Sequence, residues 1–162
     1  MKRIVCLILI CCLFLSGCQL FGEGLKDPVT FFYVKTEYDY FTQDGVIAGE
    51  QREASGHRDD LSYLLALYMM GPSEDGLESP LPRGVMLYSA EQTADEIILN
   101  ISNHESTMTD ADFSLSCACL SLTCFDITDA QSVTVISGTR SITMNRDIIA
   151  LYDSSINSEE IQ

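Results

Sequence analysis

The chain opens with a basic pair, Lys2 and Arg3, followed by an unbroken apolar run from Ile4 to Phe14. This run is too short to cross the hydrocarbon core of a bilayer, which takes about 20 residues of helix. A positive start, a short apolar run and small residues after it are typical of a secretory signal peptide. We therefore predict that residues 1–17 are removed and that only the rest of the chain folds, outside the cytoplasm.

The four residues from Leu15 to Cys18, Leu-Ser-Gly-Cys, resemble the lipobox of bacterial lipoproteins. In that motif the leader is cleaved before the cysteine, and the thiol receives a diacylglyceryl group, often with a third acyl chain such as palmitate. Two or more acyl chains are enough for stable anchoring. We therefore predict lipid attachment at Cys18, a flexible tether over residues 18–27, and an extracytoplasmic location on the cell membrane of a bacterium. The alternatives are a plain signal peptide with a chance cysteine, and a short membrane anchor.

The composition is strongly acidic, because 9 basic and 24 acidic side chains among 162 residues give a formal charge of 9 − 24 = −15. Removal of Lys2 and Arg3 with the leader leaves 7 − 24 = −17. A surface of this charge repels a phosphate backbone, so nucleic acid is excluded as a partner. The length fits one domain, and a hydrophobic content of 46% is enough for a core.

Three cysteines, Cys117, Cys119 and Cys124, remain once the leader is gone and Cys18 is lipidated. Three thiols cannot form a complete set of disulfides. On one helix, Cys117 and Cys124 would lie about 10.5 Å apart by helical rise, which is too far for a bridge. The nearest histidine, His104, has a spacing that fits no zinc pattern. We therefore predict buried free thiols, no metal and no cofactor.

Alternating apolar residues and turn signals predict the strands. They are expected over residues 28–35, 38–41, 46–48, 85–89, 96–101, 132–137 and 141–144, with a hairpin at Asp44-Gly45. In the strand over 96–101, the side chains expected to point inward are those of Ile97, Leu99 and Ile101. A loop is expected over residues 73–84.

Two helices are predicted from caps and from apolar residues at helical spacing. The first is expected after an N-cap at Ser55 and before Gly71-Pro72, and it buries Leu61, Leu64, Leu65 and Tyr68. The second is expected after a capping box at Thr109, and it buries Phe113, Cys117, Leu120 and Cys124. This order of elements predicts an α+β fold, with a mixed or antiparallel sheet and both helices on one face. The domain is expected over residues 28–153 and a disordered tail over residues 154–162.

Four segments resemble the GerMN domain family. They are the opening strand Val29–Tyr33, the helix end Leu64–Pro72, the approach to the next strand Ser79–Val85, and the stretch from Leu120 through Val133-Thr134-Val135 to Gly138. The resemblance covers most of residues 28–145 in a single copy. It implies a fold similar to the ring-building modules of secretion-like complexes, which act by self-association or partner docking. It also implies an envelope role in sporulation, germination or peptidoglycan-related assembly, and it supplies no catalytic residue.

The sequence holds no Gly-x-Ser-x-Gly motif and no glycine-rich phosphate loop. Acidic residues close in sequence are candidates for a paired-carboxylate site, although in so acidic a chain such clusters are usually solvated faces: Glu50, Glu53, Asp59 and Asp60. Asp39, Asp44 and Glu50 do not match a calcium loop. Three aromatic residues either form a binding patch or line one buried face of a strand: Tyr38, Tyr40 and Phe41.

These observations predict a non-catalytic envelope lipoprotein that meets the membrane through the lipid on Cys18. Its partner is expected to be an envelope protein or a second copy of itself. The candidate surfaces are the aromatic hairpin, Tyr38 to Ala48, and any open sheet edge. The alternatives are a small ligand-binding lipoprotein, for a cation or a cell-wall fragment, and a cell-wall hydrolase.

Overall fold

The computed structural model describes residues 25–38 and 45–149. The strands are β1 (Pro28–Lys35), β2 (Ile47–Glu53), β3 (Leu77–Glu78), β4 (Leu87–Gln92), β5 (Glu96–Ile101), β6 (Ser132–Ser137) and β7 (Arg140–Asn145). The helices are α2 (Leu61–Met69) and α3 (Asp110–Ile127). Residues 1–24, with the predicted leader and Cys18, and residues 150–162, with the predicted tail, lie outside the described residues.

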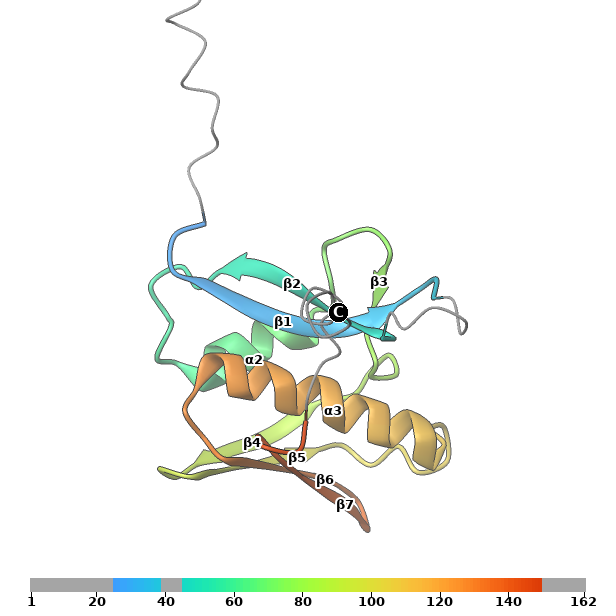
Figure 1. Cartoon of the computed structure of the whole chain (residues 1–162). Helices are drawn as coiled ribbons and strands as arrows, with labels where there is room; N and C mark the ends of the chain where they lie inside the picture. Colours follow the sequence, from blue (N-terminus) through green and yellow to red (C-terminus); the bar gives the residue numbers. More distant parts are fainter. Residues whose placement is uncertain (1–24, 39–44, 150–162) are drawn as a thin grey trace, which may run out of the picture.

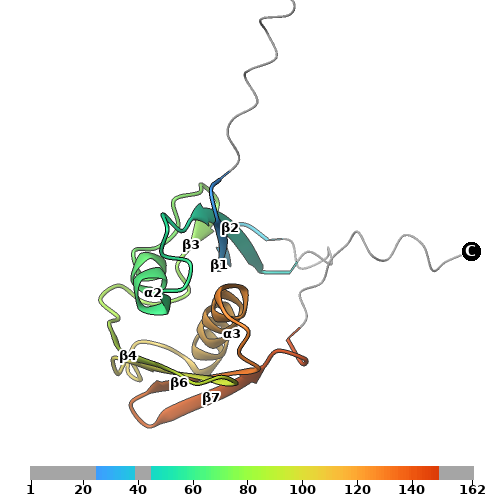
Figure 2. The same ribbon diagram turned by 90° about the vertical axis from the view of Figure 1, so that its left-hand side faces the viewer.

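The two helices form a layer between two sheets (Figures 1 and 2). One sheet has three strands in the order β2-β1-β3, and the other has four in the order β4-β5-β6-β7. In the larger sheet β5 and β6 run parallel, and the other neighbouring strands run antiparallel. The predicted α+β class is confirmed, and both helices lie on one face of each sheet.

The division into two sheets differs from the single sheet that the sequence pattern predicted. β1 pairs with β2 and β3, and the described strands β4 to β7 pair among themselves. α3 lies between the sheets and packs against β1, β6 and β7. Alternation along a strand shows which side chains face inward, but strand pairing is a contact between distant segments, so the local pattern did not distinguish one sheet from two.

Helix α3 begins as the capping box predicted. The Thr109 hydroxyl accepts a hydrogen bond from the Asp112 backbone N–H, and the Asp112 carboxylate accepts one from the Thr109 N–H. The predicted apolar face of α3 is buried as expected: Phe113, Cys117, Leu120 and Cys124. Ser121 and Thr123 are buried as well, because a helix between two sheets is covered on more than one side.

Helix α2 begins later than predicted. Its N-cap is Asp60, whose side chain accepts from the Tyr63 N–H, so the expected cap at Ser55 is wrong. Ser55 has a φ of 52° and lies in a turn, and a second turn follows before the helix starts. The predicted stripe is confirmed, since Leu61, Leu64, Leu65 and Tyr68 are all buried. The helix ends before Gly71, whose φ of 87° suits glycine.

The strand bounds agree with the predicted ones for β1, β5 and β6 and shift elsewhere. β4 begins two residues later than its predicted start and continues to Gln92, and the predicted loop over 73–84 contains the short strand β3. The hairpin predicted at Asp44-Gly45, between strands over 38–41 and 46–48, lies mostly outside the described residues. β2 pairs instead with β1, from Val34 opposite Ile47 to Pro28 opposite Glu53. Register contacts between strands, rather than local composition, determine where each strand ends.

The core lies between the sheets and around the helices. Its fully buried side chains include Val29, Phe31, Tyr33, Leu64, Leu65, Tyr68, Ile97, Leu99, Leu120, Val133 and Val135. Ile97, Leu99 and Ile101 face inward as predicted. Within residues 25–38 and 45–149, no helix has the length and apolar character needed to cross a bilayer.

Candidate functional site

The four acidic residues that were candidates for a paired-carboxylate site do not lie together in the structure. Glu50 is buried under the three-stranded sheet, whereas Glu53 and Asp59 are exposed and Asp60 caps α2. The Glu50 carboxylate accepts from the Arg52 guanidinium at 2.8 and 3.1 Å and from the Ser73 N–H at 3.0 Å. Both oxygens of the Glu50 carboxylate therefore accept hydrogen bonds from within the domain, and neither faces a substrate.

Electrostatics around Glu50 favour its charged form. Burial alone would raise its pKa, but the hydrogen bonds from Arg52 and from the Ser73 backbone outweigh that effect and hold the pKa below its usual range. Arg52 also lies over the rings of Phe31 and Tyr33, at 5.5 and 5.9 Å from their centroids. Its Nη2 donates to the Gly71 carbonyl, so this ion pair fastens β2 to the end of α2.

Two of the acidic candidates line an open hollow at the start of α2. Asp59 and Asp60 border a cavity of about 530 Å³ together with His57 and Gln92. The His57 ring stacks on the Tyr63 ring at 4.1 Å between centroids. Among the described residues, no group of three or more His, Cys, Asp or Glu is placed to hold a metal ion.

The aromatic hairpin is described only in part. Tyr38 is 39% exposed, and Tyr40 and Phe41 lie outside the described residues, as do Asp39 and Asp44. The other half of the hairpin, β2, pairs with β1 from Val34 opposite Ile47 to Pro28 opposite Glu53. The proposed aromatic patch therefore stays a prediction.

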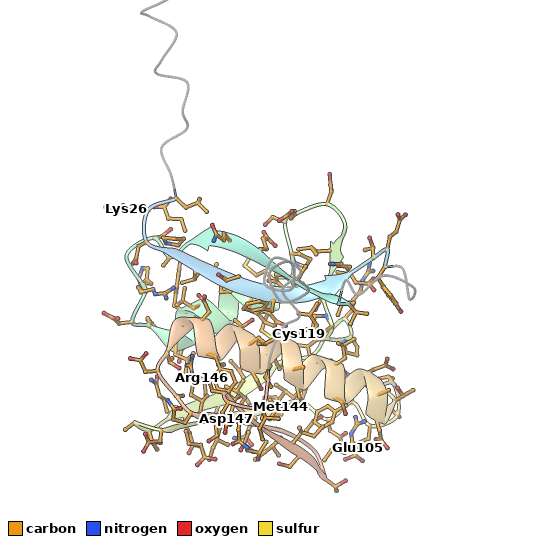
Figure 3. The ribbon with its side chains drawn as sticks, in the orientation of Figure 1. Lys26, Glu105, Cys119, Met144, Arg146 and Asp147 are labelled. Carbon is orange, nitrogen blue, oxygen red and sulfur yellow. The ribbon has the colours of Figure 1, made fainter. Side chains whose placement is uncertain are left out.

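The three cysteines are buried free thiols, as the sequence predicted. Cys117, Cys119 and Cys124 lie on α3 between the sheets, and Figure 3 shows Cys119 within this helical layer. Burial raises the pKa of each thiol to about 12. At neutral pH the thiolate, which is the nucleophile and the metal ligand, is therefore almost absent.

We expect these thiols to resist alkylation in the folded protein. A rise in pKa from 9.0 to about 12 lowers the thiolate fraction at neutral pH by roughly a thousandfold, and burial slows access further. Iodoacetamide labelling followed by mass spectrometry of the mature protein, with and without urea, measures the three rates. Rapid labelling before unfolding, or stoichiometric zinc by elemental analysis, would contradict the assignment.

One serine–histidine pair was not predicted from the sequence. His104 Nε2 lies 3.0 Å from Ser102 Oγ, and Ser102 Oγ also accepts from the Met86 N–H at 3.0 Å. The other ring nitrogen lies 3.4 Å from a hydroxyl, that of Thr107, where a serine hydrolase has a carboxylate. Ser102 is 6% exposed, so its hydroxyl is not presented to a substrate. The spacing Ser-x-His on an extended segment was the signal that could have indicated this pair.

The loop that follows β5, which contains Ser102 and His104, also holds the turn between β6 and β7. Gly138 has a φ of 61° as the first residue of a two-residue hairpin, and a Cβ there would come within 2.7 Å of Asn103 and Glu105. The Glu105 carboxylate accepts from the Thr139 N–H and hydroxyl, both at 2.7 Å. These bonds from Thr139 lower the pKa of Glu105. The loop that follows β5 thus fixes the turn before β7.

Several of the sheet edges are closed to strand addition. The side of β1 that faces away from β2 is covered, since the Thr30 N–H donates to Asp126 and the Phe32 N–H donates to the Thr123 hydroxyl. β4 has an irregular register between Leu87 and Ser89, and such a bulge discourages pairing. The second half of β2 carries charged residues, Glu50, Arg52 and Glu53, another common protection of an edge.

Comparisons with known proteins found similar solved structures. No family model and no curated protein matches the sequence. The structure is similar to one described as a "Putative Lipoprotein from Clostridium perfringens", with 18% identity over 74% of this chain and 87% of that chain, and a TM-score of 0.44. It is also similar to the tandem GerMN domains of the sporulation protein GerM from Bacillus subtilis, with 20% identity and a TM-score of 0.47.

The second similarity covers 70% of this chain and 39% of the tandem structure. The GerMN domain, which the sequence motifs suggested, is thus among the folds that this structure resembles. The α+β class itself follows from the helices and sheets described above. At these identities and TM-scores the likeness concerns fold, and no activity or residue role follows from it.

Proposed function

We propose that this chain is a lipid-anchored, non-catalytic binding protein of a bacterial cell envelope. The observation that carries the proposal is the segment from Leu15 to Cys18 directly after a short apolar run that follows basic residues. Cys18 is the attachment point for the lipid. A role in sporulation, germination or peptidoglycan-associated assembly is what the GerMN resemblance implies for such a protein.

Binding without catalysis is supported by the way the fold uses its reactive side chains. Glu50 is paired with Arg52, Ser102 is buried, and the three thiols of α3 are held neutral. A catalytic site needs a nucleophile or an acid–base pair that faces a cavity. Glu50, Ser102 and the three thiols serve the packing of the domain instead.

The charge distribution favours a neutral or basic partner. Four arginines donate to backbone carbonyls of the fold rather than standing free at the surface: Arg52, Arg58, Arg140 and Arg146. The acidic excess of the sequence is therefore only weakly offset at the surface. Such a surface repels anionic lipid headgroups and acidic proteins.

The point where the described chain begins shows which side of the domain the proposed tether joins. Lys26 lies beside the start of β1, on the side of the three-stranded sheet, and Met144 and Asp147 lie on the opposite side (Figures 1 and 3). A tether over residues 18–27 reaches at most about 35 Å when extended. A flexible tether of this length lets the domain turn, so both sheets are accessible to a partner in the envelope.

We expect Cys18→Ala to release the protein from the membrane or to leave it unprocessed. Without the thiol there is no site for the lipid, and the apolar run alone is too short to span a bilayer. Fractionation of cells, with mass spectrometry of the N-terminus, measures both outcomes. The matched control is Cys12→Ala, which lies in the leader and should leave anchoring unchanged. Membrane retention of a processed Cys18→Ala protein, or an intact leader in the mature wild type, would refute the anchor.

A further inference from the structure

Strand β7 is an edge of the four-stranded sheet whose outward backbone groups are identifiable from the register. Its hairpin with β6 has a two-residue turn, so Arg140 opposite Ser137 is the closing hydrogen-bonded pair. Every second residue of β7 pairs with β6 in this way as far as Arg146, whose N–H donates to the Gln131 carbonyl at 2.9 Å. The backbone groups of the intervening residues, Ser141 and Thr143, therefore point away from β6.

Between Arg140 and Arg146 this edge lacks the protections found on β2 and β4. Among the described strands none pairs with β7 on its far side. From Ser141 to Asn145 the strand carries no charged residue, no proline and no register shift. Natural proteins usually blunt an edge of this kind, so an unprotected one in a domain that protects the edges at β2 and β4 is a template for an added strand.

A pocket lies beside the same edge, on the face that packs against α3. It has a volume of about 360 Å³, and its walls include Phe113 and Ser114 of α3 and Ile142 of β7. Arg140 forms one end, with its guanidinium 4.6 Å from the centre of the Phe113 ring. Within the described residues its Nε and Nη2 have no hydrogen-bond acceptor. A strand added to β7 would point alternate side chains toward this pocket.

We propose that β7 receives an extended segment of a partner protein as a fifth strand, with one of its side chains in the pocket beside Phe113. This inference rests on the proposed binding role and names its surface. Main-chain hydrogen bonds from Ser141 and Thr143 would supply affinity, and the pocket would supply side-chain specificity. The segment has apolar residues at alternate positions on the helix side, and a neutral or basic charge matches the acidic domain.

A second copy of this chain is a poorer occupant than a different protein. Two copies that approach through β7 bring together two chains of formal charge −15, or 7 − 24 = −17 each once the leader is removed, and like charges oppose close packing. A basic or neutral segment meets no such repulsion. The two occupants differ in mass, so sedimentation separates them.

The test uses the full chain purified in detergent, whether lipidated or not, so that its outcome does not depend on the anchor. The probe is the fluorescein-labelled peptide Lys-Thr-Val-Thr-Leu-Thr-Val-Thr-Lys, and a peptide with prolines at the second and sixth positions is its control. We expect the probe to bind and to slow hydrogen exchange at the Ser141 and Thr143 amides at least fivefold. The Ile142 and Met144 amides, already paired with β6, should change little.

Matched variants distinguish the contribution of the β7 backbone to peptide binding from that of its side chains. Thr143→Pro removes the outward N–H, which an edge strand tolerates, and Thr143→Val keeps it. Both lose the contact between the Thr143 and Thr134 hydroxyls at 2.8 Å. We expect the proline variant to weaken binding at least tenfold and the valine variant to stay within twofold. Ser114→Phe, which fills the pocket from the exposed surface of α3, should weaken binding of the probe while leaving the circular dichroism spectrum unchanged.

Three results would overturn the proposal. The first is equal binding of the probe by Thr143→Pro and Thr143→Val. The second is no binding by the wild-type chain at about 1 mM peptide, a concentration that detects even weak complexes. The third is a dimer by sedimentation with Ser141 and Thr143 already protected from exchange in the absence of peptide, because a second copy would then occupy the edge.

Discussion

Glu50→Gln is expected to destabilise the domain by about 3–5 kcal/mol, the usual cost of removing one partner of a buried ion pair. The side chain of Glu50 is 6% exposed and that of Arg52 is 18% exposed, so the guanidinium left behind has little water to replace the carboxylate. The Ser73 N–H would lose a charged acceptor in the same step. Because small domains have a total stability of about 5–15 kcal/mol, this variant is expected to be partly unfolded on warming.

Urea unfolding followed by circular dichroism measures this effect. Glu53→Gln is the matched control, since Glu53 lies on the same strand but is exposed, and its free energy of unfolding should stay within about 0.5 kcal/mol of wild type. The double variant Glu50→Leu, Arg52→Met should recover much of the loss, because a well-packed apolar pair often replaces a buried ion pair without cost. A double variant as unstable as Glu50→Gln would show that this explanation is wrong.

The same ion pair predicts a dependence of stability on pH. The pKa of Glu50 is lower in the folded chain than its ordinary value of 4.5. A group with a lowered folded pKa contributes stability that is fully present above its unfolded pKa and is lost as the pH falls through the folded pKa. Wild type should therefore lose more stability than Glu50→Gln as the pH falls below 4.5. Parallel curves for the two proteins would contradict the assigned pKa shift.

Arg146→Ala is expected to destabilise the domain by about 2–4 kcal/mol, because a charged donor to several carbonyls is lost. Its Nε donates to the Ala130 carbonyl, and its Nη2 donates to the carbonyls of Phe125 and Thr128, at 2.6 to 2.9 Å. The guanidinium also lies 4.8 Å from the centre of the Phe125 ring. These contacts join the end of β7 to the C-terminal turn of α3, where helix carbonyls lack helical partners (Figure 3).

Thermal and urea unfolding of three variants test this assignment. Arg146→Lys keeps the charge but not the planar set of donors, so it should fall between wild type and Arg146→Ala. Asp147→Asn, at the exposed neighbouring position, is the control and should be near neutral. If Arg146→Ala unfolded within about 0.5 kcal/mol of wild type, the three carbonyl contacts would not be stabilising the domain.

The four arginines that donate to backbone carbonyls illustrate what the sequence did not reveal. Arg146 satisfies carbonyls at the end of α3, and Arg58 donates to the carbonyls of Pro28 and Asp126. Their partners are 16 or more residues away in the chain. Charge counting treats every arginine as a surface cation, so the sequence underestimated how acidic the exposed surface is.

Local signals, in contrast, predicted the elements whose causes are local. The capping box at Thr109 and Asp112 determined the start of α3, and the alternation of Ile97, Leu99 and Ile101 determined the buried face of β5. The spacing of the cysteines along one helix predicted that the thiols are free. The start of α2 was missed because Ser55 has the right side chain for a cap but lies in a turn that precedes two further turns.

By itself the sequence determined the α+β class, the order of the elements and the buried faces of helices and strands, because these follow from periods of two and 3.6 residues and from caps within a few positions. It also contains the predicted anchor at Cys18, which is a motif and needs no fold. Only the tertiary structure decided that the strands divide into two sheets, that Glu50 is buried and paired, and that no other described strand pairs with the far side of β7. Each of these depends on contacts between segments far apart in the chain, and no local pattern encodes which distant backbone groups meet.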